Sequence, residues 1–371
     1  MRRGRSPVCA ALAMLAWLLG SAFAPPQLLR DDGSTVPLSP AYLRALQAYK
    51  SPVVSARAAV LLDTASGAVL YAKNPDERMA PASLTKMMTA LVAVEQAPLA
   101  QQITATANVY TEPVVIGLDP GESMRLEDLL YGLLLTSGND AAIAIAEGVG
   151  GSLPRFIGLM NAKAERLGLN NTRFLNPHGL DAPGHYSTAL DLARLTAAMM
   201  REPTLARIVG ARDHTIAGPP LYMFRSSNPL LGRYDGVDGG KTGFTDLAGR
   251  CLAVSATRAG HQVVAVMLDS DNIAVDGQRL LDHAFGNYEW LPVSADAVLS
   301  AEFRVGTQRR EARVVGNSFV PLSHEEPRDI RGRVILDGDL SEPAIRVGQL
   351  ILESPLGRLG RFSLSSQEPT R

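Results

Sequence analysis

The stretch PASLTKMMTALVAV, residues 81–94, decides how the first half of the chain folds. Apolar residues recur in it at i, i+3, i+4, i+7 and i+8, namely Leu84, Met87, Met88, Leu91 and Val92. This spacing predicts a helix with one buried face. Ser83 and Lys86 stand three residues apart at its start, so their side chains would share a face. A buried lysine tends to lose its proton and could then activate a serine, although S-x-x-K alone fits a helix cap and a solvated charge equally well.

Apolar runs on both sides of this helix predict an α+β domain. Strands are expected at 58–62 and 68–72, joined as a hairpin, and later at 241–245, 251–257 and 262–268. Helices are expected at 126–134, 141–146, 153–167, 189–200 and 273–290. Because strands stand at both ends of this region with helices between them, we expect one sheet in which the N-terminal hairpin neighbours the later strands.

The two ends of the chain have a different composition. Residues 1–24 are interpreted as a secretory signal that is removed, because three arginines precede an apolar run from Val8 to Leu19 and Ala22-Phe23-Ala24 is a small-x-small cleavage site. The apolar run is shorter than the ~20 residues of a membrane-spanning helix. Residues 25–55 are interpreted as a linker containing one short helix at 41–49.

Beyond Leu291-Pro292, apolar residues alternate or cluster at 298–305, 311–315, 332–336 and 349–353. This pattern predicts a small all-β domain over residues 292–371. No apolar span or strongly amphipathic helix precedes Arg371, so no C-terminal membrane anchor is predicted.

The charge of the chain excludes nucleic acid as a partner. Among 371 residues, 36 Lys and Arg stand against 37 Asp and Glu, and removal of the signal with its three arginines leaves a formal charge of −4. Neutralising phosphates requires a basic excess. Cys251 is the one cysteine beyond the signal, and its apolar neighbours predict a small buried hydrophobe rather than a nucleophile.

Two further polar motifs interrupt apolar sequence. Ser137-Gly138-Asn139 lies between two apolar helices, where Ser137 could relay a proton and Asn139 could hold a substrate amide or carbonyl. Lys241-Thr242-Gly243 opens a predicted strand, where a substrate backbone could lie alongside and present a carboxylate. Taken singly, the first is most often a helix-terminating turn and the second an ordinary strand start.

The three motifs together match, in order and in placement, the pattern of penicillin-reactive serine enzymes. With the stretches at 176–180, 183–188 and 243–249, they make the chain resemble the low-molecular-mass penicillin-binding proteins, the serine-type D-alanyl-D-alanine carboxypeptidases, from about Ala58 to Trp290. The resemblance implies a penicillin-binding/β-lactamase-like transpeptidase domain at 56–291, an antiparallel sheet with helices on both sides. The β domain at 292–371 is similar to the second domain of that family.

The resemblance also implies an acyl transfer on the stem pentapeptides of peptidoglycan. Ser83 would attack the penultimate D-alanine carbonyl, release the terminal D-alanine and be freed by water. Lys86 would accept the serine proton, and Ser137 with Lys241 would protonate the leaving amine. No metal or organic cofactor is implied, β-lactams would be covalent inhibitors, and the substrate lies in the periplasm or on the cell-wall side of the cytoplasmic membrane, in agreement with export.

The substrate-binding residues implied by the resemblance are Asn139, Lys241, Thr242, Gly243 and Phe244. Lys241 and Thr242 would bind the terminal carboxylate, while the backbone N–H groups of Ser83 and Phe244 would form an oxyanion hole. One departure from the family concerns the carboxylate. Many relatives have an arginine shortly after the stretch 266–268, but residues 269–272 here contain none and the next one is Arg279.

Alternative functions share parts of this site. A DD-endopeptidase acting on peptidoglycan crosslinks would use the same residues. A class A β-lactamase needs a glutamate in the window 169–179, which contains no acid. A non-catalytic peptidoglycan-binding module would tolerate loss of the motifs, but all three are intact. His178 and His185 are interpreted as structural, because Lys86 already supplies a base.

Overall fold

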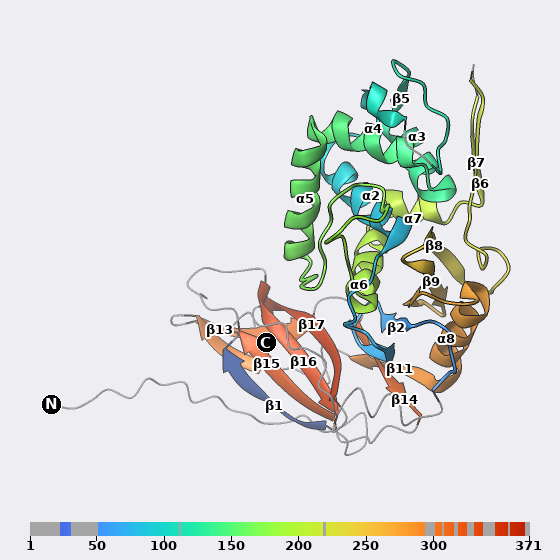
Figure 1. Ribbon diagram of the computed structural model, residues 1–371. Helices are drawn as coiled ribbons and strands as arrows, with labels where there is room; N and C mark the ends of the chain where they lie inside the picture. The colour runs from blue at the N-terminus through green and yellow to red at the C-terminus, as the bar shows by residue number, and fades with distance from the viewer. Residues whose placement is uncertain are drawn as a thin grey trace. The chain divides into compact units, whose positions relative to one another are not determined.

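The computed structural model describes residues 23–30, 51–110, 113–217, 220–293, 301–305, 308–314, 318–324, 330–336, 346–354 and 357–367. The chain divides into a larger unit, residues 50–64 and 69–286, and a smaller unit, residues 1–49, 65–68 and 287–371 (Figure 1). The predicted signal up to residue 22 and the predicted helix at 41–49 lie outside the described residues.

A five-stranded antiparallel sheet, ordered β3-β2-β10-β9-β8, forms the centre of the larger unit. The strands are β2 (Ala58–Asp63), β3 (Val69–Lys73), β8 (Val237–Thr245), β9 (Gly249–Arg258) and β10 (His261–Leu268). β2 and most of β9 and β10 are buried on both faces, which explains their continuous apolar sequence. The prediction that the N-terminal hairpin lies beside the later strands in one sheet is confirmed, since β2 pairs with β10.

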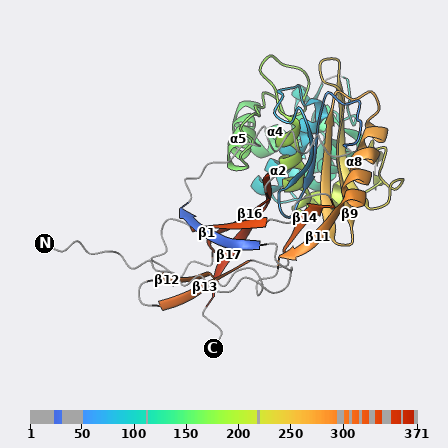
Figure 2. The same cartoon turned by 90° about the horizontal axis from the view of Figure 1, so that it is seen from below.

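Helices cover both faces of this sheet (Figure 2). On one side lie α2 (Thr85–Gln96), α4 (Asn139–Gly150), α5 (Leu153–Arg166) and α6 (Ala189–Met200). On the other side lies α8 (Ile273–Asn287), where a Cβ on Gly277 would come within 2.9 Å of Leu230 and 3.5 Å of Leu252. The absence of a side chain at Gly277 therefore lets α8 approach the sheet closely.

The predicted helix at 126–134 is in fact two pieces. α3 (Leu126–Tyr131) passes into η3 (Gly132–Thr136), a π-helical turn that ends at Ser137 with a left-handed φ of 72°. The apolar spacing predicted the buried face correctly, but it does not distinguish a π-turn from an α-turn. π-helical turns are rare and occur frequently at functional sites.

Several short elements gave no periodic signal in the sequence. They are η1 (Ala82–Leu84), β4 (Gln102–Thr104), η2 (Ala107–Val109), β5 (Ser123–Arg125), α7 (Pro203–Val209), β6 (Asp213–Ile216) and β7 (Tyr222–Arg225). Each has three to seven residues, fewer than the two helical turns or several alternations that a pattern needs. Within the described part of the chain, no single helix is long and apolar enough to span a membrane, and α4 with α5 reach that length only as a pair bent by 89°.

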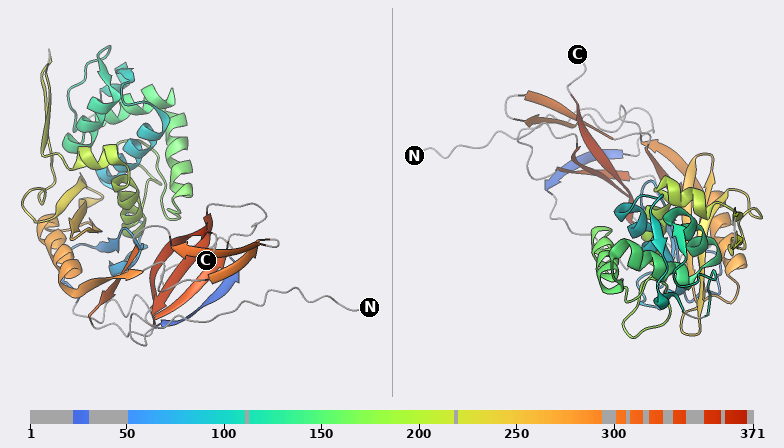
Figure 3. Two further views of the ribbon diagram at one scale, coloured as in Figure 1. Left: turned by 180° about the vertical axis from the view of Figure 1, so that it is seen from behind. Right: turned by 90° about the horizontal axis from the view of Figure 1, so that it is seen from above.

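The smaller unit consists of β-strands (Figure 3). A six-stranded sheet has the order β1-β15-β16-β17-β13-β12, and β11 pairs separately with β14. Its strands are β1 (Phe23–Arg30), β11 (Tyr288–Val293), β12 (Ala301–Val305), β13 (Gln308–Val314), β14 (Ser318–Ser323), β15 (Ile330–Leu336), β16 (Arg346–Ser354) and β17 (Gly357–Gln367).

Four strands of the smaller unit differ from the sequence predictions. β14 and β17 have no counterpart among the predicted strands, and β1 and β11 form where other structure was predicted. Phe23–Arg30 was assigned to the end of the signal and the linker, but it forms β1 and pairs in parallel with β15, which would otherwise be an edge strand. The final helix was predicted to reach Trp290, but it ends at Asn287. Tyr288–Val293 instead forms β11, because this segment pairs antiparallel with β14 and contains Pro292, which a helix interior disfavours.

A buried carboxylate joins the start of β2 to α8. Asp276, 1% exposed, accepts hydrogen bonds from the backbone N–H of Ser55 (3.0 Å) and Ala56 (2.9 Å) and from the hydroxyls of Ser55 (2.7 Å) and Ser270 (2.7 Å). Burial alone would raise the pKa of this carboxyl, but the hydrogen bonds hold it below its ordinary value. Ionised Asp276 therefore stabilises the larger unit.

We predict that Asp276→Ala lowers the free energy of unfolding at pH 7 by about 1–3 kcal/mol, because buried donors lose their acceptor. The pKa in the folded state lies below the unfolded value, so this stabilisation is complete above pH ~5 and is lost as the pH falls through the folded-state pKa. Urea unfolding of wild type and variant at pH 7 and pH 3 measures it. Asp271→Ala, in the exposed loop beside it, is the control; an equal effect of both substitutions would contradict the assignment.

Candidate active site

Ser83 lies on a constrained turn at the start of α2. It is the middle residue of η1, and the preceding Ala82 is fully buried with a left-handed φ of 46°. Gly179 has a φ of 92°, and a Cβ on it would lie only 1.9 Å from the Ala82 carbonyl oxygen. Residue 179 must therefore be glycine for the 176–180 segment to pack against the turn that carries Ser83.

The Lys86 amine is completely buried and has three oxygen partners. Its Nζ lies 2.9 Å from Ser83 Oγ, 2.7 Å from Asn139 Oδ1 and 2.7 Å from the His178 carbonyl oxygen. The amide and carbonyl oxygens only accept hydrogen bonds, whereas the serine hydroxyl can also donate. A neutral amine would donate its two protons to the Asn139 and His178 oxygens and accept the Ser83 proton with its lone pair.

Electrostatics favour that neutral form. Burial lowers the pKa of Lys86 well below its ordinary value, and the charge of Lys241 lowers it further, while Asp140 acts weakly in the opposite direction. Lys241 on β8 is 1% exposed, and burial lowers its pKa to about 7. The two lysines are close enough to influence each other, so their protonation is coupled.

The second motif continues the π-helical turn into α4. Ser137 has an unusual left-handed backbone, and its hydroxyl makes no hydrogen bond with the described residues. Asn139 is 2% exposed, and its backbone N–H donates to the Val114 carbonyl at 2.7 Å. The next residue, Asp140, accepts hydrogen bonds from the backbone N–H groups of residues 116, 117, 118 and 141. This carboxylate ties the 114–118 loop to the motif.

The third motif brings β8, an edge strand of the sheet, against Ser83. A Cβ on Gly243 would be 3.1 Å from both Ala82 Cβ and the Ser83 backbone nitrogen, so any side chain here would push the strand and the Ser83 turn apart slightly. Thr242 Oγ1 lies 2.5 Å from the Ser227 hydroxyl. Lys241 Nζ donates to the Thr242 carbonyl at 2.9 Å, and Phe244 is 60% exposed at the rim.

The structure therefore brings the three motifs together. Hydrogen bonds join Ser83, Lys86 and Asn139 directly, Gly243 lies against Ser83, and the charge of Lys241 acts on Lys86. Thr242 and Phe244 follow along the same edge strand. Ser137 adjoins Asn139 in sequence, but its hydroxyl is not hydrogen-bonded to either lysine.

The sequence did not indicate four contributors to this site. The His178 carbonyl holds Lys86, and Asn176 shapes that turn by accepting from Gly179 N–H (2.6 Å) and donating to the Leu180 carbonyl (2.9 Å). Ser227 contacts Thr242, and Asp140 orders a loop. The stretch 176–180 was noticed only as part of a resemblance, because a backbone carbonyl acting as a ligand leaves no residue-type signal.

The residues predicted to be structural do have structural partners. The ring of His185 hydrogen-bonds Thr85 Oγ1 at 3.1 Å, and His178 Nδ1 accepts from Leu180 N–H at 3.1 Å. Burial lowers the pKa of each imidazole to about 4, which keeps both neutral.

Cys251 is fully buried and its pKa is raised to about 12 by burial, which excludes an activated thiolate. Arg279 donates to the Val53 carbonyl at 2.7 Å.

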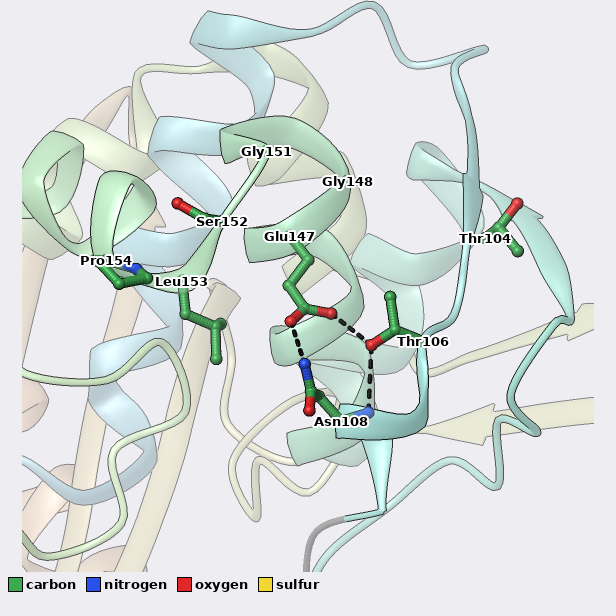
Figure 4. A pocket seen from close by; sticks show the side chains of 9 residues that line it. All are labelled: Thr104, Thr106, Asn108, Glu147, Gly148, Gly151, Ser152, Leu153 and Pro154. Atoms are coloured by element: carbon green, nitrogen blue, oxygen red, sulfur yellow. Dashed lines mark hydrogen bonds between the residues drawn. The ribbon is translucent and has the colours of Figure 1, made fainter.

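A second polar region lies apart from these motifs, where α4 ends and α5 begins (Figure 4). It is a pocket of about 480 Å³ lined by Thr104, Thr106, Asn108, Glu147, Gly148, Gly151, Ser152, Leu153 and Pro154. The Glu147 carboxylate already accepts from Thr106 Oγ1 and Asn108 Nδ2, each at 2.6 Å. The described residues contain no group of three or more His, Cys, Asp or Glu that could hold a metal ion.

Comparison with known proteins gives a consistent result. The model of peptidase family S11, D-alanyl-D-alanine carboxypeptidase, matches residues 45–272. The chain is 34% identical over 337 residues to D-alanyl-D-alanine carboxypeptidase DacF of Bacillus subtilis, covering 84% of this chain and 85% of the relative. It is 39% identical over 280 residues to D-alanyl-D-alanine carboxypeptidase DacC of Escherichia coli, covering 70% of this chain and 68% of that relative. Penicillin binding protein 5 from Haemophilus influenzae has a similar structure, with a TM-score of 0.72 and 30% identity over 86% of this chain and 98% of that one.

We predict that Gly179→Ala lowers the free energy of unfolding by at least about 2 kcal/mol, because the new Cβ must displace the Ala82 carbonyl and the residue must keep a left-handed backbone. Urea unfolding measures the change. Gly158→Ala is the matched control: it lies on the exposed side of α5 with open space around it and should raise stability by about 0.5–1 kcal/mol. If both substitutions stabilise the protein, residue 179 does not lie as close to the Ala82 carbonyl as described.

Proposed function

This chain belongs to the D-alanyl-D-alanine carboxypeptidase family, peptidase family S11, and we propose that it removes the terminal D-alanine of peptidoglycan stem pentapeptides through an acyl-enzyme on Ser83. The observation that carries the proposal is the buried contact of Lys86 Nζ with Ser83 Oγ at 2.9 Å. Two acceptor-only oxygens occupy the other two directions of the amine, so its lone pair is directed at the serine proton.

Acylation begins when Ser83 Oγ attacks the carbonyl carbon of the penultimate D-alanine and its proton passes to Lys86 Nζ. The carbonyl oxygen becomes negative, and the backbone N–H groups of Ser83 and Phe244 receive it. The place of Gly243 supports this pairing: a Cβ built on it would lie 3.1 Å from the Ser83 nitrogen, so the edge strand passes close to the donor on the nucleophile turn. Loss of one such donor typically costs 10²–10³ in rate.

Collapse of the tetrahedral intermediate breaks the bond to the terminal D-alanine, whose nitrogen takes up a proton. We assign its delivery to Ser137, with Lys241 as the source. The Ser137 hydroxyl is free of other hydrogen bonds among the described residues, and a pKa of about 7 lets Lys241 give or take a proton near neutrality. Lys86 then gives its proton back to Lys241 through solvent and is again a neutral base. Water attacks the ester carbonyl while Lys86 accepts the water proton, and collapse of this second intermediate passes that proton to Ser83 Oγ, which regenerates the hydroxyl.

Substrate recognition uses the same edge strand. A peptide lying along β8 would add a strand to the sheet, with Asn139 facing its amide and Thr242 facing its terminal carboxylate. The 2.5 Å contact with Ser227 fixes the orientation of the Thr242 hydroxyl. The residues that hold substrate are thus Asn139, Lys241, Thr242, Gly243 and Phe244.

The cellular setting follows from this substrate. Peptidoglycan lies outside the cytoplasmic membrane, so the enzyme would act after export, and the basic and apolar sequence of residues 1–24 is suited to that route. Its role would be cell wall remodelling. β-Lactams would acylate Ser83 as stable analogues of the substrate.

We predict that a fluorescent penicillin labels the purified protein covalently and that Ser83→Ala abolishes the label, because Ser83 supplies the hydroxyl that contacts the Lys86 amine. In-gel fluorescence after denaturation measures it. Ser123→Ala, an exposed serine on β5, should label like wild type. Persistent labelling of the Ser83 variant would assign the nucleophile to another residue.

We also predict that the enzyme releases free D-alanine from a pentapeptide faster than it cleaves a crosslinked peptide dimer. A coupled D-alanine assay and mass spectrometry of the dimer, at equal substrate concentration, measure the two rates. Faster cleavage of the dimer would make the protein a DD-endopeptidase with the same nucleophile. Absence of both products in a protein that still folds would contradict peptidase activity.

A further inference from the structure

β9 carries two arginines with different surroundings. Arg258 contacts the Asp235 carboxylate at 3.5 Å and stacks on the rings of Tyr234 and Phe285. Arg250, eight residues earlier, is exposed, and its side chain makes no hydrogen bond or ion pair with the part of the chain that the structure describes. Arg258 therefore has a structural role, whereas the guanidinium of Arg250 could bind a ligand.

The register of the sheet places Arg250 beside the third motif. Arg250 pairs with Phe244 across β8 and β9, and Leu252 pairs with Thr242. Cross-strand partners and residues two apart share a face of a sheet, so Arg250, Phe244 and Thr242 have side chains on the same face. Diagonal neighbours such as Arg250 and Thr242 have Cα atoms about 7–8 Å apart, within the reach of an arginine side chain.

Among the described residues, no carboxylate forms an ion pair with Arg250. Asp246 lies in the turn between the two strands, Asp269 packs against Gly249, and Asp271 is in the exposed loop beyond, yet none of them forms an ion pair with Arg250. Ser270 N–H donates to the Arg250 carbonyl at 2.9 Å, which holds the backbone of this residue in place. Arg279 is occupied at the Val53 carbonyl.

Binding of a terminal carboxylate is favoured by a side chain that stays positively charged. Burial lowers the pKa of both lysines, that of Lys241 to about 7, so near neutral pH Lys241 is only partly protonated. An arginine stays protonated throughout the physiological range, and its planar guanidinium matches a carboxylate with two parallel hydrogen bonds.

We propose that Arg250 is a substrate-binding residue whose guanidinium binds the terminal carboxylate of the D-alanyl-D-alanine peptide together with the Thr242 hydroxyl. The inference rests on the proposed function and deepens it, since it identifies the source of charge for carboxylate recognition in a chain without an arginine at 269–272. Because the carboxylate is bound in both ground and transition states, Arg250 acts mainly on KM.

The test uses the full-length enzyme with a blocked L-lysyl-D-alanyl-D-alanine tripeptide, in which the terminal carboxylate is the only acidic group. Arg250→Gln should lower kcat/KM for the free acid by about 10–100-fold, the range expected for a charge-assisted hydrogen bond, mainly through a higher KM. The C-terminal amide of the same peptide should be cleaved equally by wild type and variant. Arg250→Lys should recover part of the loss, because it restores the charge without the planar fork.

Arg155→Gln is the control, since Arg155 is also exposed and without an ion pair but lies on α5. Equal losses for acid and amide would mean a structural role, and a free-acid kcat/KM within twofold of wild type would mean no role; either result overturns the proposal. Loss only with stem peptides that carry additional carboxylates would assign Arg250 to another acidic group and overturn the terminal assignment. If wild type cleaves no peptide at all, the proposed function fails instead.

Discussion

The proposed chemistry of this protein depends on one buried amine, that of Lys86. Lys86 has no exposed surface, and its nitrogen is surrounded by a hydroxyl, an amide oxygen and a backbone carbonyl. A charged ammonium in such a place has lost its water and faces a second buried lysine, so the neutral form is favoured. Once neutral, the amine has only two protons for three oxygens, and the third contact must be one in which the serine donates.

The surrounding fold positions those three oxygens from separate parts of the chain. Ser83 comes from the turn before α2, Asn139 from the start of α4, and the His178 carbonyl from a loop 92 residues beyond Lys86. Close approaches hold these parts together: Gly179 lies against the Ala82 carbonyl, and Gly243 brings the edge strand to the nucleophile. The strained backbone at Ala82 and Ser137 persists because these contacts leave no other arrangement.

The sequence predicts the sheet, the long helices and the three motifs, because each of these repeats a pattern or combines residue types that are rare together. Leu84 to Val92 revealed the buried helix, and the order of the motifs revealed the family. The features that the sequence could not predict depend on backbone geometry and not on the type of side chain. The His178 carbonyl, the π-turn before Ser137, the parallel pairing of β1 and the strand at Tyr288–Val293 depend on long-range pairing and local backbone geometry, neither of which leaves a periodic signature.

The most direct test of the account is a titration of Lys86 itself. In protein labelled with ¹³C at the lysine Cε carbons, with the Lys86 and Lys241 signals assigned by Lys86→Met and Lys241→Met, NMR follows each amine between pH 5 and 11. The account predicts that the Lys86 signal titrates well below the ordinary lysine value of about 10.4. A Lys86 signal that remains that of an ammonium up to pH 10 would contradict it.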